Sequence, residues 1–245
     1  MKKDVAIIGY GRFGRLAARY LKKHFRVYVA DVKKITTNEK GMYIVTIDVA
    51  ARKDFVILAV PINQLQSVLR SIAPHVKRGS LICDVCSVKE LPVQWMKNIL
   101  PKNVSILGTH PLFGPDSASK HIDGRTLILT PVRIPLRQLR NVKEHLSTAG
   151  IRVKQISASG HDKLMAETLF LTQFIGHGLL RFPLLRTSIA TQNFELLHHI
   201  AVTTGNDSIE LFKDMFQYNR FARSIPKRVA QKFLALSRSL NSPKR

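Results

Sequence analysis

The chain has 245 residues, and its 39 Lys and Arg against 16 Asp and Glu give a formal net charge of +23. Hydrophobic residues make up 45% of the chain, which suffices for a packed core and excludes an intrinsically disordered basic tail. No apolar run reaches the roughly 18 residues of a membrane-spanning helix. Because two cysteines are too few for a disulfide framework, we expect a folded, very basic protein in the reducing cytoplasm.

The first thirty residues predict a βαβ unit. Residues 4–10 (DVAIIGY) form a short apolar run bounded by glycine, which is typical of a buried strand and argues against a signal peptide. Apolar side chains then recur at i, i+3, i+4, i+7 and i+8 over residues 13–21, as on one face of a helix. Residues 26–31 (RVYVAD) predict the second strand.

Strand and helix patterns alternate to about residue 157. This alternation predicts an α/β protein with a doubly wound parallel sheet of the Rossmann type. The further strands are expected at residues 55–60, 80–85, 104–109, 125–130 and 151–156, with helical patterns at 63–73 and 137–149.

The pattern beyond residue 157 is helical throughout. We predict a dinucleotide-binding domain over residues 1–157 and a smaller all-helical domain over residues 158–245. The helices of this second domain are expected at residues 161–182, 192–204, 207–222 and 226–240.

A glycine-rich motif, Gly9-Tyr10-Gly11-Arg12-Phe13-Gly14, joins the first predicted strand to the first helix. In G-x-G-x-x-G the first glycine makes the turn, the second lets a diphosphate approach the backbone, and the third packs the helix on the strand. Asp31 ends the second strand, about 20 residues on, where a carboxylate accepts hydrogen bonds from ribose hydroxyls. Since Asp31 would repel a 2′-phosphate, the motif favours NAD, while the nearby Lys33 and Lys34 leave NADP open.

Ligands of doubly wound sheets bind beyond the carboxyl ends of the strands. Three segments should meet there beside the glycine loop: Val60-Pro61, residues 86–89 and residues 110–115. His110 is the histidine best placed to accept a proton during oxidation of an alcohol, and Ser87 could orient it or bind substrate. The alternative is a histidine that only satisfies backbone groups in a proline-rich turn.

Other chemically suggestive residues are interpreted as structural. Cys83 and Cys86 lack a second pair, so buried thiols are favoured over a metal site, and no metal is expected. The pair His198-His199 lacks acids at ligand spacing. Helical spacing also assigns His177, Phe170, Phe174 and Phe182 to the core.

Several segments together resemble the prephenate/arogenate dehydrogenases of tyrosine biosynthesis, and most closely their plant-like arogenate dehydrogenase branch. The resemblance spans residues 4 to about 220. It is carried by Asp84-Val85-Cys86-Ser87-Val88-Lys89, by Gly108-Thr109-His110-Pro111-Leu112-Phe113-Gly114-Pro115, by His161-Asp162, and by Thr204–Ser208 with Phe216–Asn219.

The resemblance implies oxidative decarboxylation of arogenate or prephenate with hydride transfer to NAD(P)+. His110 would accept the proton of the ring hydroxyl, Ser87 would hydrogen-bond this hydroxyl and His110, and the helical domains would pair into a homodimer. Many relatives carry a second histidine where this chain has Gln173, and Arg220 is a candidate for the arginine that holds a substrate carboxylate.

The predicted site divides into three groups of residues. The catalytic residues are His110 and Ser87. The cofactor-binding residues are Gly9, Gly11, Arg12, Phe13, Gly14, Asp31, Val60 and Pro61, and the substrate-binding residues are Ser87, Thr109, His110, Thr172, Gln173 and Arg220.

Two alternatives remain beside this prediction. One is another dehydrogenase or reductase that joins a Rossmann domain to a helical domain and acts on a small carboxylate. The other is a non-catalytic protein that uses its basic surface to bind nucleic acid. Because the chain has no recognisable nucleic-acid motif and its basic residues are spread along the sequence, we expect no nucleic-acid partner.

Overall fold

The computed structural model describes residues 3–36, 40–182, 184 and 187–241. The chain divides into two compact units, Met1–Ser159 and Gly160–Arg245, whereas the sequence predicts the boundary after residue 157. In the described part of the chain, no helix has the length and apolar character needed to cross a membrane.

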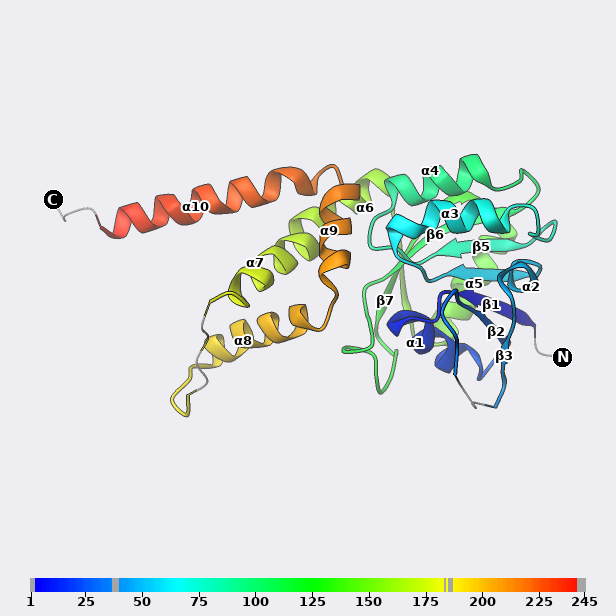
Figure 1. The fold of residues 1–245 in the computed structure, drawn as a ribbon, viewed down its shortest axis with the longest axis horizontal. Helices are drawn as coiled ribbons and strands as arrows, with labels where there is room; N and C mark the ends of the chain where they lie inside the picture. Colours follow the sequence, from blue (N-terminus) through cyan, green and yellow to red (C-terminus); the bar gives the residue numbers. More distant parts are fainter. Residues whose placement is uncertain (1–2, 37–39, 183, 185–186, 242–245) are drawn as a thin grey trace. The chain divides into compact units, whose positions relative to one another are not determined.

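A single sheet organises the first unit (Figure 1). Its described strands follow the order β3-β2-β1-β4-β5-β6-β7-β8, and the first six places reproduce the order typical of dinucleotide-binding sheets. The predicted doubly wound α/β fold is confirmed. The strands are β1 (Asp4–Ile8), β2 (Arg26–Ala30), β3 (Met42–Ile44), β4 (Phe55–Leu58), β5 (Leu81–Asp84), β6 (Ser105–Pro111), β7 (Thr126–Arg133) and β8 (Arg152–Gln155).

The direction of the last two strands corrects the prediction of a wholly parallel sheet. Strands β1 to β6 pair in parallel, but β7 runs antiparallel to β6, and β8 follows the direction of β7. A parallel neighbour requires a crossover connection, usually a helix, and residues 112–125 between β6 and β7 contain none. The chain therefore returns antiparallel.

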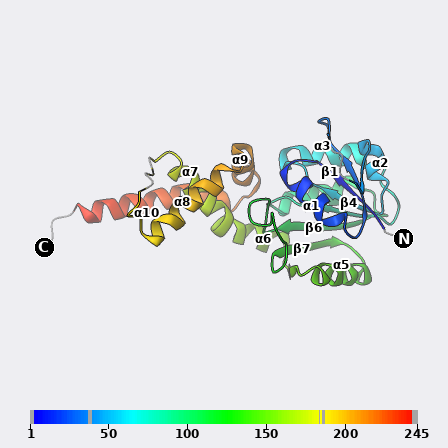
Figure 2. The ribbon, with the colours of Figure 1, turned by 90° about the horizontal axis from the view of Figure 1, so that it is seen from below.

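Helices cover both faces of this sheet (Figures 1 and 2). Phe55 of β4 packs against two hydrophobic clusters. One contains Ala18 of α1 and the other contains Leu139 of α5, so α1 and α5 lie on the same face of the sheet. Helices α2, α3 and α4 cover the other face. The bounds are α1 (Arg12–Leu21), α2 (Ile47–Ala51), α3 (Ile62–Ile72), α4 (Glu90–Ile99) and α5 (Leu136–Thr148).

The described residues of the second unit form helices and the turns between them, with no strand, as predicted. Its core is aromatic: the Phe170 ring stacks on Phe212 with centroids 5.4 Å apart, while Phe182, predicted to be core, is 65% exposed. The expected helix over 161–182 contains a π-helical turn. The elements are α6 (Ala158–Met165), the π turn (Ala166–Phe170), α7 (Leu171–Leu179), α8 (Gln192–Gly205), α9 (Ile209–Tyr218), a 3₁₀ turn (Ala222–Ser224) and α10 (Ile225–Leu240).

Candidate active site

The three glycines of the G-x-G-x-x-G motif occupy different surroundings. Gly9 has φ 101°, and a Cβ there would lie 2.3 Å from the carbonyl oxygen of Ala59. A Cβ on Gly14 would lie 2.0 Å from the carbonyl oxygen of Gly9, so the helix sits directly against the loop. A Cβ on Gly11 would meet no atom within 4 Å. The loop therefore leaves open space at Gly11, the residue that precedes α1.

Asp31 ties the glycine loop to the end of β2. Its Oδ2 accepts a 2.6 Å hydrogen bond from the Tyr10 N–H, and its Oδ1 accepts one of 2.8 Å from the Lys33 N–H. A carboxylate offers about four acceptor positions. Asp31 can therefore hold the loop and still accept from the hydroxyls of a ribose.

The N-terminus of α1 is suited to an anion. Gly11 supplies no side-chain cap, and the first turn contains no acidic residue, so the partial positive charge of the helix end is not offset by its own sequence. Val60 and Pro61 follow β4 at the same edge of the sheet, and a Cβ on Gly9 would lie 2.9 Å from Val60 Cγ1. These residues can therefore border a dinucleotide placed at Gly11.

The predicted cofactor residues Arg12 and Phe13 contact the loop that follows β6. Arg12 Nη2 lies 2.9 and 3.0 Å from the two carboxylate oxygens of Asp116. The Phe13 ring packs on Phe113 with centroids 6.5 Å apart. The first turn of α1 is thus joined to a segment about a hundred residues away in the sequence.

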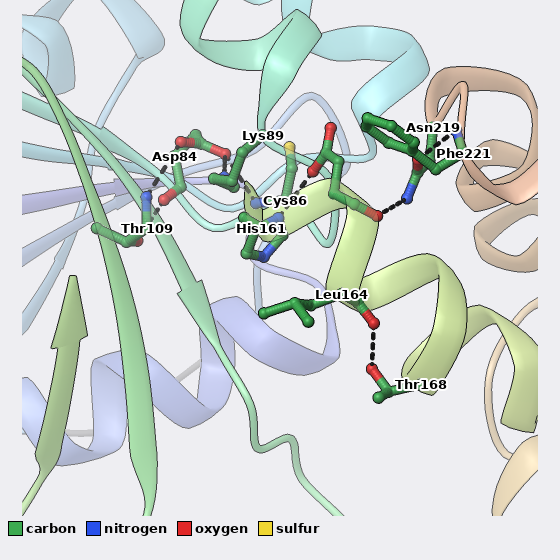
Figure 3. A network of polar contacts seen from close by, with 10 residues as sticks. Asp84, Cys86, Lys89, Thr109, His161, Leu164, Thr168, Asn219 and Phe221 are labelled. Carbon is green, nitrogen blue, oxygen red and sulfur yellow. Dashed lines mark hydrogen bonds and ion pairs between the residues drawn. The ribbon is translucent and has the colours of Figure 1, made fainter. Parts of the chain in front are cut away.

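A buried network connects the end of β5 to β6 (Figure 3). The Asp84 carboxylate accepts from the Cys86 N–H at 3.0 Å and from the Thr109 N–H at 3.3 Å, and it pairs with the Lys89 ammonium. The Thr109 hydroxyl donates to the Asp84 carbonyl oxygen. Neither Asp84 nor Lys89 has any exposed side-chain surface. This network fixes the turn over residues 85–89.

Ser87 lies in that turn, and His110 lies on the neighbouring strand. The structure corrects the expectation that His110 follows its strand, because β6 extends to Pro111 and pairs His110 with Ile128 of β7. His110 is 6% exposed. Since β5 and β6 are parallel neighbours, their carboxyl ends bring the Ser87 turn and His110 to adjacent places on the sheet edge.

Both cysteines are buried thiols outside any disulfide, as the sequence predicts. Burial and the adjacent Asp84 carboxylate raise the pKa of the Cys83 thiol, which disfavours the reactive thiolate. Among the residues that the structure describes, no three His, Cys, Asp or Glu side chains are grouped as metal ligands.

The other predicted substrate-binding residues belong to the helical unit. Gln173 is 7% exposed, and its Nε2 donates a 3.0 Å hydrogen bond to Asp207 Oδ2, which leaves its buried Oε1 without a partner. Thr172 is exposed. Arg220 is also exposed, and its guanidinium lies 4.4 Å from the centroid of the Phe221 ring.

Two further polar groups of this unit were not among the predicted site residues, although His177 is buried as the helical spacing predicts. His161 Nδ1 lies 2.7 Å from Asp162 Oδ1, both side chains are buried, and Asn219 Nδ2 donates to the Asp162 carbonyl oxygen at 2.8 Å (Figure 3). His177, one helical turn after Gln173, has a buried Nε2 without a partner. The adjacent His-Asp pair was a visible signal in the sequence, but its burial was not.

Comparison with known proteins identifies two family models along the chain. Residues 17–155 match the model described as prephenate dehydrogenase, nucleotide-binding domain. Residues 179–245 match the model described as TYRAAT1-like, C-terminal domain.

Individual relatives agree with these matches. The chain is 30% identical to arogenate dehydrogenase 2, chloroplastic, of Arabidopsis thaliana over 254 residues, covering 96% of this chain and 69% of that protein. It is also 30% identical to arogenate dehydrogenase 1, chloroplastic, over 252 residues, covering 97% of this chain but only 39% of the longer relative. The crystal structure of prephenate dehydrogenase from A. aeolicus, in complex with hydroxyphenyl propionate and NAD+, has the same fold. The superposition of the two structures has a TM-score of 0.75 at 19% sequence identity, and it covers 98% of this chain and 91% of the A. aeolicus chain.

Proposed function

The chain belongs to the prephenate/arogenate dehydrogenase family, and we propose that it catalyses the oxidative decarboxylation of a cyclohexadienol carboxylate with NAD+ as hydride acceptor. The observation that carries this proposal is the open, uncapped N-terminus of α1 at Gly11, at the same sheet edge as His110. Open space beside the N–H groups of a helix N-terminus is what a dinucleotide diphosphate requires.

The cofactor choice rests on Asp31. Its carboxylate lies at the end of β2 and is held by two backbone N–H groups, so it would meet the ribose hydroxyls of NAD and repel the 2′-phosphate of NADP. The A. aeolicus enzyme, which shares the fold, is described with NAD+ bound. Bound NAD+ would supply the acceptor for the hydride, and the protein supplies position and a base.

His110 is proposed as that base. Its imidazole would take the proton of the ring hydroxyl while hydride leaves the same carbon, and loss of CO2 would return the bonding electrons to the ring and make it aromatic. Ser87 would orient the hydroxyl and His110, and Thr109 would fix the strand end through Asp84. The buried position of His110 inside β6 suits this role because a rigid base needs little reorganisation.

The side-chain amide of Gln173 favours arogenate over prephenate as the substrate. Because Asp207 can only accept, it holds the Gln173 amide with Nε2 toward itself and Oε1 free. A free buried acceptor suits a ligand that donates, as the ammonium of an alanyl side chain does and the ketone of a pyruvyl side chain does not. Thr172 and Arg220 are proposed as further substrate contacts.

We also propose a homodimer formed through the helical unit. Ile225 and Val229 of α10 belong to the core of this unit, but Phe233, Leu236 and Leu240 continue the same helical stripe and are 56–78% exposed. A second copy would cover them. A cytoplasmic location rests only on two cysteines that form no disulfide, and the Arabidopsis relatives are named as chloroplastic.

The deciding experiment is a spectrophotometric assay of arogenate and prephenate, each with NAD+ and NADP+. We expect turnover with NAD+, and faster turnover with arogenate. Absence of turnover in all four combinations would refute the proposal. Tight DNA binding that weakens steeply with salt would instead support the nucleic-acid alternative.

A further inference from the structure

The loop over residues 112–124 is fastened to α1 along the length of the helix. It begins directly after β6, the strand that carries His110, and crosses to a helix about a hundred residues earlier in the chain. Near the middle of the loop, Ala118 is completely buried. The polar contacts are Tyr20 Oη donating to the Ala118 carbonyl oxygen at 2.9 Å, Arg19 Nη2 donating to the Ser119 carbonyl oxygen at 2.9 Å, and Arg12 Nη2 donating to Asp116 at 2.9 and 3.0 Å.

The contact between Arg12 and Asp116 differs from the other two. Tyr20 and Arg19 bind backbone carbonyls, which hold the loop whatever its sequence. Arg12 instead pairs with a carboxylate, and Arg12 is the first residue of α1, beside the open space at Gly11. The loop thus places the carboxylate of Asp116 against a side chain that directly follows Gly11, the proposed diphosphate position.

We propose that Asp116 is an internal competitor of the cofactor: its carboxylate holds the Arg12 guanidinium until the diphosphate of the dinucleotide displaces it. This inference rests on the proposed dinucleotide site. A guanidinium binds phosphate and carboxylate oxygens with the same geometry, so one can replace the other on Arg12. Both side chains of the pair are more than 40% exposed, and exposed ion pairs are weak enough to be exchanged.

The exchange requires only a local movement. Asp116 lies in a short turn closed by a 3.1 Å hydrogen bond from the Gly114 N–H to Ser117 Oγ and by one of 2.9 Å from the Ala118 N–H to the Gly114 carbonyl. Ala118 remains held by Tyr20, so release of Asp116 frees the turn and not the whole loop. Because this turn follows His110 and Pro111, dinucleotide binding would alter the surface next to the base before substrate arrives.

The test is calorimetric titration of NAD+ into the 245-residue chain, without substrate. Asp116→Asn should bind NAD+ about two- to fivefold more tightly than the wild type, as expected for one charge near a helix N-terminus. Arg12→Gln should bind NAD+ about tenfold more weakly, since it removes a charge-assisted hydrogen bond. In the double variant the gain from Asp116→Asn should disappear, because the two residues act through one contact.

Two controls separate this competition from general electrostatics. Asp123→Asn removes the same charge from the same loop and should leave the affinity for NAD+ unchanged. Adenosine, which has no diphosphate, should bind wild type and Asp116→Asn equally. Asp116→Ser provides a second variant with the same expected gain and guards against a folding defect peculiar to asparagine.

The outcomes distinguish this inference from the proposed function. If NAD+ does not bind the wild type, the proposed function is wrong. If NAD+ binds but neither Asp116 variant gains affinity, or the gain persists in the Arg12→Gln background, only the competition is wrong.

Discussion

The ammonium of Lys89 is paired with the carboxylate of Asp84, and neither side chain has exposed surface. Five residues apart in sequence, they close the turn that carries Ser87. A buried pair of this kind is costly to break from one side, because the remaining charge keeps its hydrogen bonds but has neither water nor an opposite charge beside it.

Lys89→Met should therefore lower the free energy of unfolding by about 3–5 kcal/mol in urea denaturation. Lys77→Met is the matched control, since Lys77 makes a 2.6 Å ion pair with Asp54 that is more than half exposed. Lys77→Met should lower the free energy of unfolding by no more than about 1 kcal/mol. Equal losses in the two variants would show that Lys89 is hydrated in solution.

The glycine loop provides a second pair of variants. Gly14→Ala should destabilise the fold by about 1–3 kcal/mol, because its Cβ would lie 2.0 Å from the Gly9 carbonyl oxygen. Gly11→Ala meets open space, so its melting temperature should stay close to the wild type while its affinity for NAD+ falls about tenfold or more. Thermal unfolding and calorimetry separate the two effects; normal NAD+ binding by Gly11→Ala would place the diphosphate elsewhere.

His110→Asn should lower kcat about 10²–10⁴-fold, the usual contribution of a general base, with little change in the affinity for NAD+. His121→Asn, in the exposed part of the loop after β6, is the control and should keep the wild-type rate. A wild-type kcat for His110→Asn would remove His110 from the mechanism.

Gln173→Leu should reduce kcat/KM for arogenate about 10–100-fold, because it deletes an acceptor for a charged donor. Prephenate serves as the internal control, and its kcat/KM should fall much less. A parallel loss for both substrates would mean that Gln173 does not meet the side chain in which they differ.

His177 predicts a pH dependence of stability. Burial and the neighbouring Arg181 lower its pKa below the ordinary value of 6.5, although Asp207 acts in the opposite direction. Below pH 6.5 the unfolded chain therefore binds a proton that the folded chain resists, so stability falls as the pH drops through this range. His177→Gln should lose less stability than the wild type between pH 7.5 and pH 5. Identical pH profiles would show that His177 does not contribute.

The fold was largely predictable from sequence because hydrophobic periodicity marks buried strands and helix faces directly. Three features were not. Strands β7 and β8 have the same apolar pattern whichever way they run, so their direction depended on the connection. The short strand β3 and helix α2 carry too few residues for a periodic signal. The strand predicted over residues 104–109 continues to Pro111 as β6 and so includes His110.

The candidate site was likewise predictable only in part. Gly9, Gly11, Gly14 and Asp31 are recognisable from spacing, because one turn followed by one helix dictates their arrangement. The pairing of Arg12 with Asp116 joins residues 104 positions apart and has no local signature. Asp84 and Lys89 both belong to a motif that the sequence analysis named. Only the structure shows that the two side chains pair and are buried away from water.

The place of His110 within β6 has a consequence for how this member of the family can diversify. Its strand is hydrogen-bonded to β5 on one side and β7 on the other, so the backbone of the proposed base is fixed by the sheet. Insertions or deletions after Pro111 would reshape the loop that contacts α1 without displacing the imidazole. Cofactor affinity and substrate choice can thus change in separate segments while the proposed proton acceptor, His110, stays in place.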